Sequence, residues 1–145
     1  YEIAKYPNWF QRKCTGATRA HYSLQNDGTV QVINRCQTQS KEMIEAVGTA
    51  RQIGSASSPK LEVRFAPAWL SFLPFVWGDY WVIDLDEDYQ LVAVSEPKKE
   101  YLWILSRTEK VDPAIYQSLL TRLQQQGFDL RRLEITPQDI KAPHN

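Results

Sequence analysis

The fold class is indicated most directly by residues 18–36, TRAHYSLQNDGTVQVINRC. Both halves of this stretch alternate between two faces with a period of two, which is the pattern of half-buried β-strands. The Asn-Asp-Gly tripeptide at residues 26–28 has the composition of a tight hairpin turn. This turn places Tyr22 opposite Val32. The stretch therefore predicts an antiparallel hairpin.

Similar strand patterns extend on both sides of this hairpin. Residues 61–65, LEVRF, are the clearest, with Leu61, Val63 and Phe65 on the inward face. The other strand-like segments are residues 1–6, 43–52, 79–85, 89–95 and 101–106. About eight strands joined mostly by short turns favour an antiparallel up-and-down β-barrel over a sandwich. Five small residues with inward parity predict a ligand cavity in place of a filled core: Ala4, Ala20, Ala46, Gly48 and Ala50.

The period of the pattern changes after the eighth strand. Asp112 followed by Pro113 is typical of a helix start, and Gly127 is typical of a helix end. The apolar stripe of this helix comprises Ile115, Leu119, Leu120 and Leu123. One such stripe, on a helix over about residues 112–126, is expected to pack on the outside of the barrel. Residues 128–135 fit a short ninth strand, so we expect one domain over residues 1–136 and a tail over 137–145.

The composition excludes several function classes. The chain has 145 residues, enough for one domain with its own core. Its formal net charge of +0 gives no indication of a nucleic-acid partner. No apolar run reaches the roughly 20 residues that a membrane-spanning helix needs. The chain begins abruptly at Tyr1 without a signal peptide, so we expect a mature or trimmed form of a longer product.

Residues 66–77, APAWLSFLPFVW, interrupt the strand pattern. The stretch carries no charge, and Pro67 and Pro74 disfavour both a helix and a central strand. Two interpretations are open at this point. In the first, the loop folds over the barrel edge as a satellite hydrophobic cluster. In the second, it forms a hydrophobic rim that guides a lipid inward, contacts a membrane surface or makes a homodimer.

Three short motifs give the chain a family resemblance. Residues 85–89, LDEDY, resemble the motif TDxxY with Leu85 in place of threonine, and residues 101–107, YLWILSR, precede a proline-started helix. In this order and spacing the chain resembles the lipocalins, specifically the bacterial outer-membrane lipocalins and their plant temperature-induced relatives. Residues 1–4, YEIA, are similar to the family's first strand directly after its GxW motif, and the chain starts too late to contain that motif. The resemblance covers almost the whole chain.

The resemblance implies a closed end of the barrel. There Asp86 and Tyr89 belong to the second motif, and the Arg107 side chain packs on an aromatic face in a structural role. The loops at the open end are then residues 7–16, 66–77 and 96–100. The resemblance also implies a location in the bacterial cell envelope, in the periplasm or at the outer membrane. The anchor would be an N-terminal lipoprotein segment that is missing from this chain.

Cys14 and Cys36 are the only cysteines in the sequence. The hairpin register places Thr18 opposite Cys36, and the returning first loop brings Cys14 to the end of that strand. A periplasmic location permits oxidation of the pair. We therefore predict a Cys14–Cys36 disulfide that ties the first loop to the barrel.

No group of residues in the sequence indicates catalysis. An enzyme needs a converging nucleophile, base or metal site, and His21 and His144 lie far apart in the chain. The parity of His21 is outward, so we expect it at the surface. Asp84 and the carboxylates of residues 86–88 straddle a strand end and a turn, which is typical of a solvated hairpin rather than of a calcium site. We expect a non-enzymatic protein without metal or cofactor.

Strand parity and the resemblance together predict which residues line the barrel interior. The candidate ligand-binding residues are Tyr22, Val32, Asn34, Phe65, Trp77, Tyr80, Val82, Tyr101 and Trp103. Glu2 is a further inward candidate. Apolar walls with a few hydroxyl or amide groups suit an amphiphile with its tail inside and its head near the rim. The expected partner is therefore a lipid-like small molecule of the fatty acid or lysophospholipid class. The alternative is an interaction module with a filled barrel, which dimerises or contacts a membrane through residues 66–77.

Overall fold

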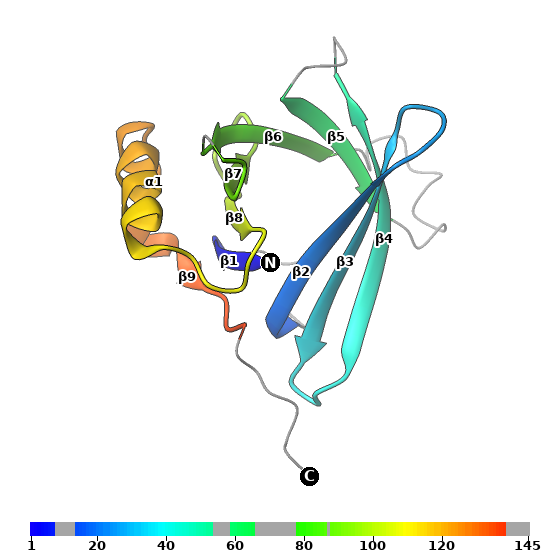
Figure 1. The fold of residues 1–145 in the computed structure, drawn as a ribbon, viewed down its shortest axis with the longest axis horizontal. Coiled ribbons are helices and arrows are strands. Elements are labelled where there is room, and N and C mark those ends of the chain that lie inside the picture. Colours follow the sequence, from blue (N-terminus) through cyan, green and yellow to red (C-terminus); the bar gives the residue numbers. More distant parts are fainter. Residues whose placement is uncertain (8–13, 54–58, 66–77, 87, 139–145) are drawn as a thin grey trace.

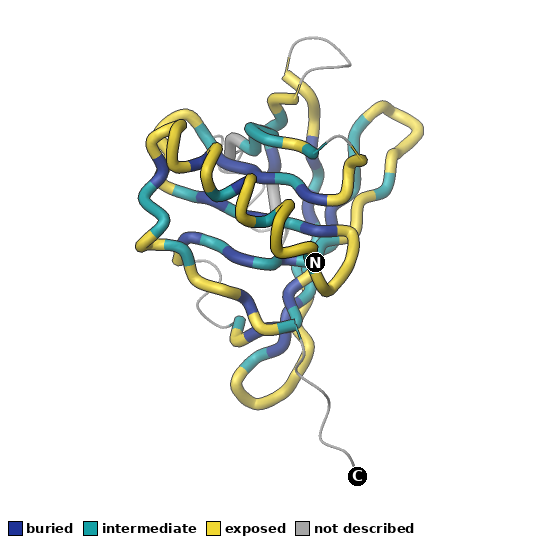
Figure 2. The backbone as a smooth tube through the Cα atoms, turned by 60° about the vertical axis from the view of Figure 1, so that its left-hand side comes forward, coloured by how far each residue is buried: buried dark blue, intermediate teal, exposed yellow. Residues whose placement is uncertain are grey.

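The strands of this protein alternate between more and less buried positions, as the sequence pattern predicts (Figure 2). The computed structural model describes residues 1–7, 14–53, 59–65, 78–86 and 88–138. The elements are β1 (Glu2–Lys5), β2 (Cys14–Leu24), β3 (Val30–Thr38), β4 (Met43–Gln52), β5 (Lys60–Phe65), β6 (Gly78–Leu85), β7 (Leu91–Ser95), β8 (Trp103–Ser106), α1 (Pro113–Gln125), a 3₁₀ helix (Leu130–Arg132) and β9 (Glu134–Ile135).

The nine strands in the described part of the chain form one antiparallel sheet, in the order β2-β3-β4-β5-β6-β7-β8-β1-β9 (Figure 1). Strands that are neighbours in sequence are neighbours in the sheet from β2 to β8, which is the up-and-down arrangement. Tyr22 pairs with Val32, as the hairpin turn predicts. The sheet curls so that β2, β3 and β4 stand opposite β7 and β8, and α1 lies outside (Figure 1). The predicted fold class is confirmed.

The segment that follows β9 connects β1 to β2, the edge strand at the other end of the sheet order. The side-chain amide of Gln138 donates to the carbonyl of Glu2 over 2.5 Å and to that of Thr18 over 2.7 Å. In return, the Ala17 amide donates to the Pro137 carbonyl over 2.7 Å. A primary amide carries two protons, so the Gln138 side chain can donate one hydrogen bond to a carbonyl of each strand and thereby connect β1 with β2.

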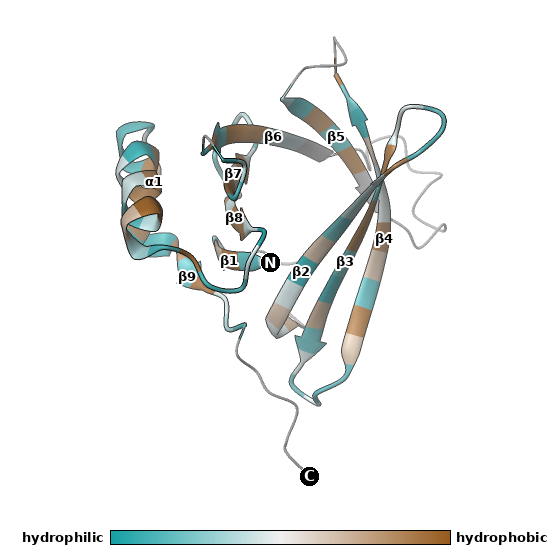
Figure 3. Ribbon diagram, in the orientation of Figure 1, coloured by the Kyte–Doolittle hydropathy of each residue, from teal (hydrophilic) through white to brown (hydrophobic). Residues whose placement is uncertain are grey.

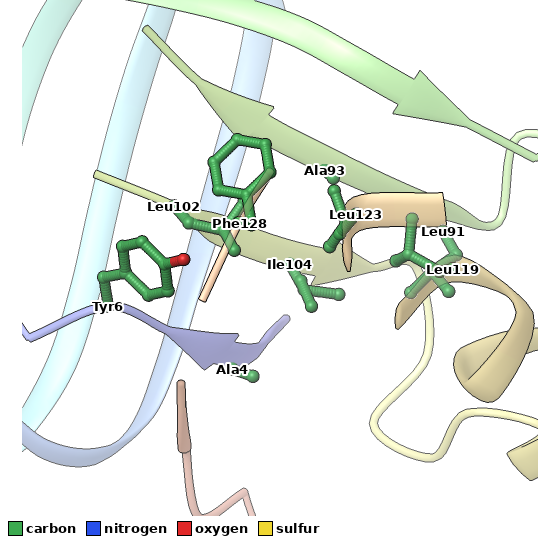
Figure 4. Close-up of a cluster of buried hydrophobic side chains, with 9 residues drawn as sticks. All are labelled: Ala4, Tyr6, Leu91, Ala93, Leu102, Ile104, Leu119, Leu123 and Phe128. Atoms are coloured by element: carbon green, nitrogen blue, oxygen red, sulfur yellow. The ribbon is translucent and has the colours of Figure 1, made fainter. Parts of the chain in front are cut away.

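The helix α1 covers the outer face of β7, β8 and β1, with its hydrophobic side turned toward the sheet (Figure 3). Its start follows from the sequence: Pro113 occupies the first turn, and the Asp112 side chain accepts a hydrogen bond from the Ala114 amide over 2.8 Å. Leu119 and Leu123 are fully buried. The cluster beneath α1 comprises Ala4, Tyr6, Leu91, Ala93, Leu102, Ile104, Leu119, Leu123 and Phe128 (Figure 4). None of the helices in the described residues is long and apolar enough to cross a membrane.

The first apolar residue of the predicted stripe, Ile115, is not buried with the others. It is 40% exposed, so this part of the prediction is wrong. Near the start of α1 the strand β6 ends, and an open cleft of about 690 Å³ lies between the helix and the turn after Leu85. Ile115 borders that cleft. The Arg122 guanidinium anchors the helix beside it through two hydrogen bonds to the Asp84 carboxylate, of 2.8 and 3.0 Å.

The prediction that Ala4 points into the barrel is also wrong, because Ala4 belongs to the cluster beneath α1. The pairing of β1 with β8 shifts register between Glu2 and Ala4. Glu2 lies opposite Leu105, whereas Ala4 lies opposite Ile104, and these two neighbours on β8 point to opposite faces. A β-bulge of this kind reverses the parity of the residues beyond it. Strict alternation along the sequence cannot reveal it.

The predicted Cys14–Cys36 disulfide is confirmed. It links the first residue of β2 to β3, with the two Cα atoms 5.5 Å apart. The hairpin between them stays in register from Arg19 to the turn, and the pairing shifts only near Cys14. The disulfide therefore fastens the end of the hairpin where the backbone ladder is irregular.

The turn between β6 and β7 is organised by the carboxylate of Asp86. Its Oδ1 atom accepts hydrogen bonds from the amides of Leu91 and Gln90, over 2.7 and 2.6 Å. Tyr89 adopts a left-handed conformation at φ 57°, and its carbonyl accepts a hydrogen bond from Arg107 Nε over 2.6 Å. The turn between β6 and β7 thus contains Asp86 and Tyr89 and is contacted by Arg107. The resemblance groups these three residues as structural.

Truncation of the helix stripe tests its packing. Leu119→Ala or Leu123→Ala should each lower the free energy of unfolding by roughly 2–5 kcal/mol, as loss of a buried leucine does. The matched control is Ile115→Ala on the same helix, which should cost less than about 1 kcal/mol because this residue is partly exposed. Urea denaturation midpoints measure the three effects. Equal losses at all three positions would contradict the observed placement of the helix.

The Asp86 turn predicts a pH dependence of stability. The Leu91 amide, with that of Gln90, holds the pKa of the Asp86 carboxyl below its usual range. A carboxyl with a lowered pKa in the folded state adds stability above its unfolded pKa, near 3.9, and loses that contribution as pH falls through the folded value. Asp86→Asn should therefore be less stable than wild type at pH 7, and the gap should close below about pH 4. Asp88→Asn in the same turn is the control, and an Asp86→Asn gap that is constant with pH would contradict the argument.

Candidate ligand-binding site

The strand register places most of the predicted site residues on one face of the sheet. Tyr22 lies opposite Val32, which lies opposite Gly48 on the next strand. On β6, β7 and β8, Val82 lies opposite Val94, and Val94 lies opposite Trp103. Directly opposite residues in an antiparallel pair point to the same side. Asn34, two residues after Val32 on β3, shares this face, opposite Ala20 and Ala46.

A hydrogen bond between two tyrosines shows that this face is the inner one. The hydroxyls of Tyr22 on β2 and Tyr80 on β6 are 2.5 Å apart. These strands are four places apart in the sheet order, and in a flat sheet about 19 Å would separate them, at roughly 4.8 Å per strand. The two side chains meet only because the sheet curls and brings the inner faces of β2 and β6 together.

Aromatic rings continue this inner wall beyond Tyr80. The rings of Tyr80 and Trp103 stack with centroids 6.2 Å apart and planes 27° apart. The ring of Tyr101, just before β8, stacks on the ring of Trp103, with centroids 5.8 Å apart and planes 14° apart. Three of the predicted site residues thus form one continuous row of rings across β6 and the start of β8.

Small aliphatic side chains pack beside the aromatic row. Val32, Ala50 and Val63 are buried together on β3, β4 and β5, and Tyr80 packs against them. Val32 is only 3% exposed. The inner face therefore combines an apolar patch with phenol hydroxyls, the combination expected of a site for a molecule with an apolar part and a polar part.

The tyrosine hydroxyls are uncharged at neutral pH. Burial raises the pKa of the Tyr22 phenol, although the residue is 45% exposed. Both facts fit a side chain that is partly in contact with solvent and partly surrounded by protein. Burial also raises the pKa of Tyr80 well above its ordinary value, and the nearby Tyr22 phenol and Glu2 carboxylate raise it further.

One predicted site residue cannot be placed, and another is placed only through its backbone pairing. Trp77 lies outside the described residues, as does the whole 66–77 loop. The backbone of Phe65 pairs with Gly48, so its position belongs to the inner face by register. Both interpretations of the 66–77 loop therefore stay predictions.

One inward residue was missed in the sequence. Val94 is 1% exposed and lies between Val82 and Trp103 on the inner face. It escaped notice because β7 reads LVAVS, which is apolar or small at every position. The strand is covered by α1 on one side and faces the interior on the other, and a strand buried on both faces carries no alternation signal.

The polar residues that the sequence analysis considered for catalysis or metal binding have structural partners or face solvent. Asp84 is held by Arg122, and Asp86 caps the β6–β7 turn. Residue 87 lies outside the described part of the chain. His21 is exposed, as expected from its parity. No group of three or more potential metal-ligating side chains converges within the described residues.

Comparison with known sequences agrees with this geometry. The Lipocalin-like domain family matches residues 1–138. Temperature-induced lipocalin-1 of Arabidopsis thaliana is 37% identical over 146 aligned residues, covering 100% of this chain and 78% of that protein. The outer membrane lipoprotein Blc of Vibrio cholerae is 38% identical over 135 residues, covering 92% and 74%. Apolipoprotein D of Macaca fascicularis is 31% identical over 153 residues, covering 96% and 72%.

Solved structures share the fold at much lower identity. Lobster apocrustacyanin A1 superposes with a TM-score of 0.72 at 12% identity, over 99% of this chain and 77% of that one. Insecticyanin from the tobacco hornworm Manduca sexta has a TM-score of 0.70 at 15% identity, over 94% and 75%. The chain belongs to the lipocalin family, whose members are non-enzymatic proteins that bind small hydrophobic ligands.

Proposed function

We propose that this protein holds a long-chain amphiphile of the fatty acid or lysophospholipid class in the space enclosed by its curled sheet. The observation that carries the proposal is the inner wall itself. It joins the row of Tyr80, Tyr101 and Trp103 to the aliphatic patch around Val32. An acyl chain has the apolar surface that such a wall can shield from water.

The energetics favour a long chain. Each buried methylene contributes roughly 0.8 kcal/mol, so a chain of a dozen or more carbons offsets the cost of ordering the ligand. Apolar walls discriminate poorly between chains that differ by one methylene. Selectivity for the ligand class therefore depends on the few polar groups of the wall, such as the hydroxyls of Tyr22 and Tyr80.

We also propose that the protein acts at a membrane of the cell envelope. Two observations support this. Several relatives are outer membrane lipoproteins by name, including that of Vibrio cholerae, and the Cys14–Cys36 disulfide suits an oxidising compartment. In this proposal the uncharged 66–77 stretch contacts the membrane surface from which the lipid comes.

Enlarging a side chain of the inner wall tests the proposed ligand site. Val32→Trp should weaken binding of 1-myristoyl-lysophosphatidylcholine and myristate at least about tenfold, because the new ring occupies space meant for the acyl chain. Ile33→Trp is the matched control, since Ile33 is the next residue of β3 and faces outward, opposite His21 and Val47. Its affinity should stay within about twofold of wild type. Isothermal titration calorimetry below the critical micelle concentration measures both.

The quenching of tryptophan fluorescence gives a second readout. Ligand binding should change the emission of wild type, and Trp103→Ala should remove most of the change because Trp103 lies in the aromatic row. A wild-type protein that shows no saturable response to either amphiphile contradicts the proposal. A concentration-dependent dimer or binding to lipid vesicles in the absence of such a response would favour the interaction module with a filled barrel.

A further inference from the structure

The open cleft beside α1 plays no part in the proposed function. It lies between α1 and the turn that follows Leu85, and it has a volume of about 690 Å³. Since α1 lies outside the curled sheet (Figure 1), the cleft is separate from the row of rings and the aliphatic patch of the inner wall. None of the described residues that border it belongs to the predicted ligand-binding set. A partner in this cleft would therefore not compete with a lipid in the interior.

The apolar part of the cleft continues the buried stripe of α1. Ile115 lies about one helical turn before Leu119 and two turns before Leu123, so the three share one face of the helix. Leu119 and Leu123 are buried against the sheet, whereas Ile115 is 40% exposed. Leu85, which borders the cleft at the end of β6, is 43% exposed. The first turn of the stripe thus has apolar surface that the described part of the chain leaves uncovered.

The polar part of the cleft carries a negative charge. Three aspartates border it, Asp84, Asp86 and Asp88, together with one arginine, Arg122. The arginine is already paired with Asp84, through hydrogen bonds of 2.8 and 3.0 Å. Among the described residues Asp86 and Asp88 form no ion pair. Uncovered apolar surface beside two uncompensated carboxylates is complementary to an apolar group with a positive charge next to it.

The shape of the cleft favours a polypeptide over a small molecule. Sites for small molecules enclose most of the surface of the ligand, whereas this cleft is open to solvent. A peptide segment brings several side chains at once. It can place an apolar side chain against the helix and a charged one at the rim, as segments that bind in surface grooves do.

We propose that the cleft binds a segment of a partner protein in which aliphatic side chains are flanked by lysine or arginine. An aliphatic side chain of the segment covers Ile115 and extends the apolar stripe of α1. A basic side chain pairs with Asp88 or Asp86 at the rim. The inference does not depend on the proposed function, because the two sites share no residue.

Synthetic peptides of defined composition test this chemistry. The probe is acetyl-GKLLKKG-amide, titrated into the ¹⁵N-labelled protein while the backbone amide chemical shifts are recorded. Saturable shifts should be centred on the cleft, at Leu85, Asp88 and Ser118. Two control peptides, acetyl-GELLEEG-amide and acetyl-GKSSKKG-amide, lack the positive charges or the aliphatic side chains. Each should bind at least about fivefold more weakly than the probe.

Neighbouring positions of α1 show whether the cleft is the site. Ser118 borders the cleft and Gln117 does not, and both residues are exposed. Ser118→Arg occupies the cleft and adds a positive charge, so it should weaken binding of the probe at least about tenfold. Gln117→Arg adds the same side chain outside the cleft and should stay within about twofold of wild type. Asp88→Asn should weaken binding about two- to fivefold, the contribution of one exposed ion pair.

The apolar contact has its own matched pair of variants. Ile115→Ala removes the exposed end of the stripe and should weaken binding of the probe at least about fivefold. Ile53→Ala is the control, because Ile53 has a similar exposure, 37%, and does not border the cleft. Its affinity should stay within about twofold of wild type.

Five outcomes would overturn the inference. Absence of saturable shifts removes the site, and shifts centred on Val32 and Trp103 place the peptide in the interior instead. Equal binding of the acidic peptide removes the charge complementarity. An equal loss in Ser118→Arg and Gln117→Arg shows that the cleft is not the site. A concentration-dependent dimer that shifts the same amides without peptide assigns the cleft to a second copy of the chain. The lipid titrations are separate from all five, so the proposed function stands or fails independently.

Discussion

The packing of α1 against β7, β8 and β1 fixes which side of the sheet is outside. Leu119 and Leu123 lose almost all contact with solvent in that interface, together with Ile104 and Leu102 beneath them. Such burial is the largest favourable contribution that a short helix can make. Once one face of these strands is occupied by the helix, their other face must turn toward the interior. The arrangement of the inner wall follows from that division.

The two faces of the sheet have different chemistry. The outer cluster contains closely packed aliphatic and aromatic side chains. The inner face carries a smaller aliphatic patch, a row of rings and phenol hydroxyls. Here the helix supplies a core outside the sheet.

The ends of the curled sheet need their own connections, because a meander leaves its first and last strands unpaired with each other. The Gln138 side chain bridges carbonyls of β1 and β2, and the Cys14–Cys36 disulfide fastens the end of the β2–β3 hairpin. In addition, the Arg107 side chain, just after β8, donates a hydrogen bond to the carbonyl of Tyr89 in the turn between β6 and β7. These contacts connect segments that are distant in sequence, and they are few.

The sequence alone determined the local structure, because each signal lies within a few neighbouring residues. Alternation and the turn at residues 26–28 predicted the hairpin that pairs Tyr22 with Val32, and Asp112 with Pro113 predicted the start of α1. Parity together with the family resemblance predicted a set of inward residues where alternation was regular. The disulfide was predicted from the hairpin register together with the oxidising location that the family resemblance implies.

Only the tertiary structure decided the rest. The bulge that turns Ala4 outward depends on how β1 meets β8, and the exposure of Ile115 depends on where β6 ends beneath the helix. Val94 was hidden because its strand is buried on both faces. The hydroxyl contact between Tyr22 and Tyr80 joins strands four places apart. No local pattern encodes it, because it exists only once the whole sheet has curled.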